Sequence, residues 1–229
     1  MTINKVVAEF IGTFLLVFIG TATAVFAGSG ILSQSMGILA IAFAFGFTLM
    51  AVIYAIGPVS GAHVNPAVTI AMLLAKKISA KESMFYIVAQ IFGAIIASAL
   101  LWIILSGVTG ASGAAGITFG LGANDVPSFI TPISALLLEI ILTFALVFVI
   151  FGVTAKDSGH AGLAIGSTLF VAHLIGVPLG DSSLNPARSI GPALLQGGTA
   201  LVNVWVFIAG PIIGALIAVL VAKVIFAKA

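Results

Sequence analysis

Two copies of the tripeptide Asn-Pro-Ala are the most informative chemical feature of this sequence. They lie at Asn65-Pro66-Ala67 and Asn185-Pro186-Ala187, each in a short polar stretch between long apolar runs. One copy is an ordinary helix start, because asparagine caps the free N–H groups of the first turn and proline suits the position after it. Two copies at matching places in two halves of a chain predict a duplicated site.

The chemistry open to such a pair is hydrogen bonding to a neutral molecule. Each helix N-terminus presents unpaired N–H groups and the positive end of a helix dipole. We expect each asparagine to cap its own helix through the side-chain oxygen and to turn its NH2 donors toward a shared space. Two such ends would favour a molecule that offers oxygen lone pairs and would repel cations and protons, which is typical of a channel.

The composition indicates that lipid surrounds the elements that position these residues. Hydrophobic residues make up 62% of the chain and charged residues 6%, and the mean hydropathy is +1.35, outside the range of soluble domains. A membrane-crossing helix needs about 20 apolar residues, and six stretches reach that length, near 6–27, 36–56, 82–106, 132–154, 160–179 and 201–226. The segments 66–75 and 186–195 reach only about half of it. We therefore predict an all-α membrane protein with six transmembrane helices and two re-entrant half-helices.

The two halves of the chain resemble each other. The stretch around Glu9 matches the stretch around Glu139, and the two Asn-Pro-Ala copies lie at similar places in their halves. Because each half contains three spans, the second half enters the membrane from the opposite side, which makes an inverted repeat. We expect one transmembrane domain over 1–229, with halves of approximately 1–115 and 130–229 joined by the Gly- and Ser-rich segment 107–131.

The lysines predict the orientation in the membrane. All of them fall in the termini or in loops that six crossings place on one side: Lys5, Lys76, Lys77, Lys81, Lys156, Lys223 and Lys228. The positive-inside rule then places both termini in the cytoplasm, and we expect a multi-pass protein of the plasma membrane. The pI of 9.1 therefore reflects topology, and we expect no nucleic-acid partner.

Arg188 stands apart from these lysines, because it lies three residues into the second half-helix. A charge within the membrane is costly and is a functional candidate by default. At the positive end of a dipole it would disfavour cations. A structural arginine that ties loop carbonyls together is the alternative, and both roles can coexist.

The segments SGAHVNPAVT (60–69) and SLNPARS (183–189), together with Glu9 and Glu139, resemble the aquaporins, the major intrinsic protein family. The resemblance covers nearly the whole chain. It implies a six-span barrel with a pore in each subunit, assembled as a homotetramer in the lipid bilayer, with water as the permeant.

The resemblance also implies a narrow filter on the extracellular side of the motifs, formed by Phe45, His173, Ser182 and Arg188. Phenylalanine and histidine leave room for little more than water, whereas glycerol-conducting relatives usually carry glycine in place of the histidine. Ile208 departs from the water-type pattern, because tryptophan is common at its position, and strict water selectivity is left open.

The family also implies roles for the loops before the half-helices. Glu9 and Glu139 are expected to accept hydrogen bonds from backbone N–H groups of these loops. Acceptors for passing water are expected from five backbone carbonyls, those of Gly61, Ala62, His63, Asp181 and Ser183.

Three functions remain open at this stage. We predict a passive channel that conducts water in single file; the alternatives are a broader channel for glycerol or dissolved gases and, less favoured, an ion-coupled transporter in which Glu9 or Glu139 relays protons. An enzyme is not expected, since the chain offers no nucleophile and base pair, no metal ligands and no cofactor motif. For Asp157 and His160 a pH gate is conceivable, but a solvated loop is the simpler interpretation.

Overall fold

In the part of the chain that the computed structural model describes, six helices are long and apolar enough to cross a membrane, as the sequence predicts. The structure describes residues 2–29, 32–107, 120–155 and 159–226, and no strand occurs in these ranges. The crossings are α1 (Ile3–Gly28), α2 (Gln34–Ser60), α4 (Ala80–Ser106), α6 (Pro132–Thr154), α7 (Ala161–Gly180) and the pair of α9 (Gly198–Asn203) with α10 (Val206–Ile225). Lys156, Asp157, Lys228 and most of the segment expected to join the halves lie outside the described residues.

The two half-helices are α3 (Pro66–Leu74) and α8 (Pro186–Gln196). Their 9 and 11 residues correspond to about 14 Å and 17 Å of helix, against the roughly 30 Å of a hydrocarbon core. The caps explain where they begin: the side chain of Asn65 accepts from the Ala67 N–H, and that of Asn185 accepts from Ala187 and Arg188. Proline follows each cap, where its missing N–H costs nothing.

The sixth crossing differs from its predicted form as one continuous span. Helix α9 ends at Asn203 and α10 begins at Val206. Polar anchors account for the short separate helix, because Thr199 and Asn203 of α9 donate to the carboxylate of Asp125, in the loop before α6. The start of this crossing is therefore tied to a loop rather than continuing straight into α10.

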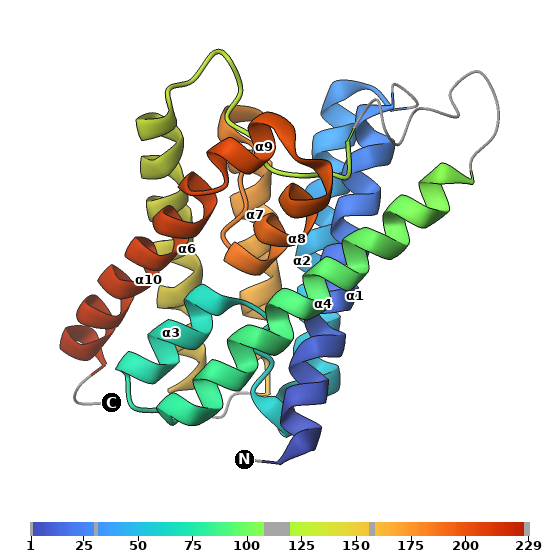
Figure 1. Cartoon of the computed structure of the whole chain (residues 1–229). Helices are drawn as coiled ribbons and strands as arrows, with labels where there is room; N and C mark the ends of the chain where they lie inside the picture. Colours follow the sequence, from blue (N-terminus) through green and yellow to red (C-terminus); the bar gives the residue numbers. More distant parts are fainter. Residues whose placement is uncertain (1, 30–31, 108–119, 156–158, 227–229) are drawn as a thin grey trace.

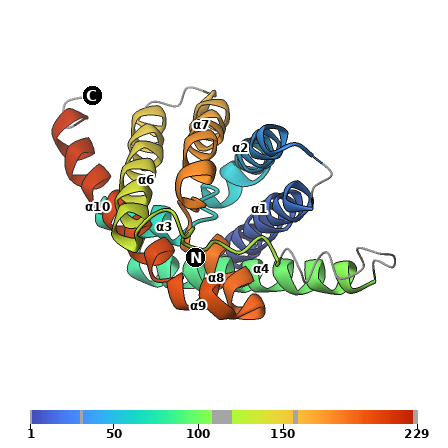
Figure 2. The ribbon, with the colours of Figure 1, turned by 90° about the horizontal axis from the view of Figure 1, so that it is seen from above.

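The long helices form a curved wall around α3 and α8. Helix α1 packs against α2 and α4, α6 packs against α7 and α10, and α2 against α7 joins the two groups. In Figure 1, α3 and α8 lie between the long helices at different heights, and Figure 2 shows the wall from above. The N-termini of the half-helices consequently face each other near the middle of the molecule.

Glycines permit the close helix crossings, and they occur in matched pairs. A Cβ atom on Gly46 of α2 would lie 2.8 Å from the carbonyl oxygen of Gly166 of α7, and a Cβ atom on Gly166 would lie 2.6 Å from the carbonyl oxygen of Gly46. Similarly, Gly93 of α4 lies against the backbone of α1, and Gly214 of α10 lies against the backbone of α6. The same packing device thus recurs in both halves of the chain.

Candidate functional site

The asparagines of the two motifs bind across the middle of the molecule. Asn65 donates through Nδ2 to the Leu184 carbonyl at 2.8 Å, and Asn185 donates to the Val64 carbonyl at 2.9 Å. Each side-chain oxygen meanwhile caps its own half-helix. Since an NH2 group carries two donors, one N–H on each asparagine remains for the cavity that both residues line.

The two residues that supply these carbonyls have an uncommon backbone conformation. Val64 and Leu184 have φ of 43° and 59°, a left-handed region where bulky side chains are rare, at a cost of about 1–3 kcal/mol each. Their N–H groups donate to the Oε2 atoms of Glu9 and Glu139, at 2.7 Å and 2.9 Å. Each strained residue is therefore held at its N–H by a glutamate of its own half and at its carbonyl by an asparagine of the other half.

Glu9 and Glu139 are buried, and both oxygens of each carboxylate accept hydrogen bonds from protein donors. The Oε1 atom of Glu9 accepts from Ser60 Oγ and the His63 N–H, while that of Glu139 accepts from Ser182 Oγ and the Ser183 N–H.

The halves differ in one respect at these carboxylates. Glu9 also accepts from Gln90 Nε2 at 2.7 Å, whereas Gly210 lies against Glu139, so that a Cβ there would come within 2.5 Å of the glutamate Cβ. Among the described residues Glu139 has no amide donor corresponding to Gln90, so it accepts one side-chain hydrogen bond fewer than Glu9.

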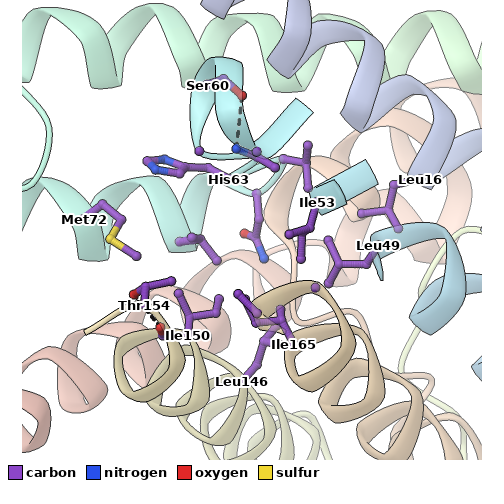
Figure 3. A pocket seen from close by; sticks show the side chains of 18 of the residues that line it. Leu16, Leu49, Ile53, Ser60, His63, Met72, Leu146, Ile150, Thr154 and Ile165 are labelled. Carbon is purple, nitrogen blue, oxygen red and sulfur yellow. Dashed lines mark hydrogen bonds between the residues drawn. The ribbon is translucent and has the colours of Figure 1, made fainter. Parts of the chain in front are cut away.

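A cavity of about 730 Å³ runs through the described part of the molecule from Lys5 and Glu82 to Arg188. In Figure 3, Ser60 and His63 lie on one side of it, opposite Leu146, Ile150 and Ile165. The long side chains on the apolar wall offer no hydrogen bonds, so a permeating molecule would bind weakly there, which favours rapid passage.

Four of the five predicted carbonyl-bearing residues line this cavity: Gly61, Ala62, His63 and Ser183. Asp181 does not line it, and its carbonyl accepts a hydrogen bond from Asn124. The role of these carbonyls as acceptors for water stays a prediction.

Three of the four predicted filter residues meet around the ring of Phe45. The rings of Phe45 and His173 are stacked with centroids 4.7 Å apart, and the Arg188 Cζ lies 4.9 Å from the Phe45 centroid. His173 Nδ1 bonds to the Leu169 carbonyl at 3.0 Å, while its buried Nε2 has no protein partner among the described residues. The hydroxyl hydrogen of Ser182 points to Glu139. The cavity lining ends at Phe45, His173 and Arg188 on this side, since no described residue beyond them contributes to it.

Asn124 and Gly122 hold the arginine in place. Arg188 Nη1 donates to the Gly122 carbonyl at 2.8 Å and to Asn124 Oδ1 at 2.7 Å, while its Nε has no described protein partner. Asn124 also donates to the carbonyls of Asp181 and Ser182. The sequence analysis missed Asn124, because asparagine in a Gly-rich loop is ordinarily a turn residue, and no local signal separates the two cases.

Asp181 supports the same region from the end of α7. Its Oδ2 accepts from the Asp125 N–H at 2.9 Å. Burial raises the pKa of Asp181 to about 6, although the positive charge of Arg188 opposes the shift. This carboxyl group therefore titrates in a range close to neutral pH.

Comparisons with known proteins agree with this architecture. The model of the family described as "Major intrinsic protein" matches residues 1–222. The chain is 44% identical over 225 residues to glycerol uptake facilitator protein-like 6 of Lactiplantibacillus plantarum, covering 96% of this chain and 97% of that protein. It is 39% identical over 228 residues to aquaporin Z of Rhodopseudomonas palustris, covering 98% and 94%. The X-ray structure of the aquaglyceroporin from Plasmodium falciparum superposes with a TM-score of 0.83 at 24% identity, covering 98% of this chain and 96% of that one. The chain belongs to the major intrinsic protein family of membrane channels.

Proposed function

We propose that this channel conducts water passively in single file and excludes glycerol, protons and ions. The observation that carries the proposal is the contact of Phe45 with both His173 and Arg188, at 4.7 Å and 4.9 Å. Non-bonded atoms lie about 3.5–4 Å apart at contact. Phe45 already contacts both other side chains, so glycerol, with its chain of carbon atoms, has no path between these groups. Water, with its smaller size, needs the least displacement of the three side chains.

Two features support the exclusion of cations and protons. The N-termini of α3 and α8 face the middle of the pore, so their positive dipole ends oppose a cation there. Arg188 adds a full positive charge at the filter, at the end of the cavity that it lines. A proton or a sodium ion would meet positive electrostatic potential at both places.

Ion-coupled transport is disfavoured by the state of the membrane carboxylates. A relay needs a carboxylate that can exchange a proton or bind an ion. Every oxygen of Glu9 and Glu139 already accepts at least one hydrogen bond from a loop N–H, a side-chain hydroxyl or Gln90. Both groups therefore serve best as anchors of the two loops.

Conduction of glycerol or other small neutral solutes is the second candidate. It is favoured by the relative named as a glycerol uptake facilitator-like protein, at 44% identity, and by Ile208, which departs from the water-type pattern. Ile208 is half-buried and does not line the described cavity. Its effect on the pore would have to be indirect, so we favour water selectivity.

We place the end of the molecule where α1 begins and α10 ends toward the cytoplasm of the cell membrane. Lys5, Lys76, Lys77, Lys81 and Lys223 belong to the ends of α1, α3, α4 and α10 at that end of Figure 1, as the positive-inside rule requires. We further propose that the whole chain acts as one channel domain, with halves of approximately 1–115 and 130–229, and that it assembles as a homotetramer, on the strength of the family resemblance.

Stopped-flow light scattering on proteoliposomes tests the function directly. The wild type should shrink rapidly under an osmotic gradient of an impermeant solute and should show no glycerol-driven reswelling above that of empty liposomes. His173→Gly should gain glycerol entry, because it removes the ring that stacks on Phe45. His160→Gly makes the same exchange in a cytoplasmic loop and should leave both fluxes unchanged. Glycerol entry through the wild type would favour the second candidate, and a requirement for an ion gradient would favour coupled transport.

A further inference from the structure

We propose that Gly20 of α1 sets the width of the filter, because its missing side chain provides the space that receives the edge of the Phe45 ring. This inference rests on the proposed water conduction and names a residue that the motif and filter positions do not include. Gly20 is separated from Phe45 by the last turns of α1, a loop and the first turns of α2.

The contact between the two residues is close. A Cβ atom built on Gly20 would overlap the Cε1, Cζ and Cδ1 atoms of Phe45. Glycine in the interior of a helix is unfavourable relative to alanine, and Gly20 lies well inside α1. Its position therefore calls for a packing reason, which the ring of Phe45 provides.

The other surroundings of the ring decide which way it would move if this space were filled. Phe45 is 1% exposed, and it contacts the His173 ring and the Arg188 guanidinium on the pore side. A methyl group at position 20 would push the ring edge away from α1, into these two side chains. The passage between them would then narrow.

Movement of α1 away from α2 is the competing response, and the packing resists it. On its other side α1 contacts α4 at Gly93, where a Cβ would lie 2.5 Å from the Phe10 carbonyl oxygen. Because α1 is held closely between α2 and α4, the aromatic side chain is the part that can yield. The ring is also the far end of its side chain, so it can turn without a change in the backbone.

The test is a double-mutant cycle in proteoliposomes with Gly20→Ala, Phe45→Leu and the combined variant. Gly20→Ala should lower water permeability per folded channel by at least about fivefold, because the added methyl group overpacks the space beside Phe45 and the ring yields by moving into the filter. The combined variant should match Phe45→Leu within about twofold, because leucine has no ring edge for the methyl group to displace.

Gly37→Ala is the matched control. It adds a methyl group to the same α1/α2 packing, 3.1 Å from the Ala27 Cβ and remote from Phe45. Its water permeability should stay close to that of the wild type. An equal loss in Gly37→Ala would attribute the effect to helix spacing and overturn the proposal.

The other outcomes of the double-mutant cycle also support or overturn the role of Gly20. Wild-type-like flux in Gly20→Ala, or a combined variant as impaired as Gly20→Ala alone, would overturn the role of Gly20 while leaving water conduction intact. If Gly20→Ala does not fold, a folded and conducting combined variant supports the proposal, and a combined variant that also fails to fold overturns it. Absence of water flux through the wild type would overturn the proposed function and this inference together.

Discussion

Replacing Asn124 with alanine tests whether a single loop side chain keeps the filter arginine in its position. In the structure, Arg188 Nη1 has two described acceptors, the Gly122 carbonyl and Asn124 Oδ1, at 2.8 Å and 2.7 Å. Alanine removes the second acceptor. It also removes the donor that Asn124 offers to the carbonyls of Asp181 and Ser182.

The size of the effect follows from the charge on the arginine. A hydrogen bond to a charged group contributes about 1.5–3 kcal/mol, so its loss changes the ratio of held to released arginine by a factor of about 10 to 160. A released guanidinium can turn toward the cavity of about 730 Å³ that it already lines, where water would solvate it. We expect the arginine then to lie across the path and water permeability to fall by at least about fivefold.

The assay is osmotic shrinkage of proteoliposomes, normalised to the amount of folded channel. Asn124→Asp keeps an acceptor for Arg188 and should retain more flux than Asn124→Ala. Asn203→Ala is the control, since Asn203 also donates to a loop at this end of the molecule, at 2.7 Å to Asp125, but does not contact the arginine. Unchanged flux in folded Asn124→Ala would refute the reasoning.

Three further predictions concern the loops around the filter. Glu139→Gln should lower the free energy of unfolding by about 2–4 kcal/mol, because an amide NH2 would face the Leu184 N–H in place of a carboxylate oxygen; thermal unfolding in detergent measures this, and an unchanged midpoint would contradict it. The chain has no cysteine, so mercuric ions should leave its water flux unaffected; acute block of the purified wild type would disprove this. Asp181 has a pKa of about 6 in the folded protein and about 3.9 in an unfolded chain, so its contribution to stability is complete below about pH 4 and is lost as pH rises through about 6. The unfolding temperature should therefore fall between about pH 4 and pH 6 and level off above that, with a smaller fall in Asp181→Asn, and equal pH profiles would argue against a titrating Asp181.

The helical architecture could be predicted because its causes are local in the chain. A run of apolar residues long enough for the bilayer becomes a crossing whatever lies beside it, and the six predicted spans are confirmed. Asparagine followed by proline starts a helix through bonds within three residues, so the beginnings of α3 and α8 at Pro66 and Pro186 follow from the motifs themselves. The break between α9 and α10 could not be predicted, since it depends on the anchoring of α9 to Asp125 in a distant loop.

Hydropathy and helix capping act over a few neighbouring residues, so the membrane environment, the duplicated motif and the residue types available to the pore follow from the chain alone. How these residues control one another depends on tertiary packing. Asn65 holds the Leu184 carbonyl, Asn124 holds Arg188, and Gly20 receives the ring of Phe45. The partners in these pairs belong to segments that are far apart in the chain, and they meet only when α1, α2, α8 and the loop before α6 pack together, which no local pattern in one sequence encodes.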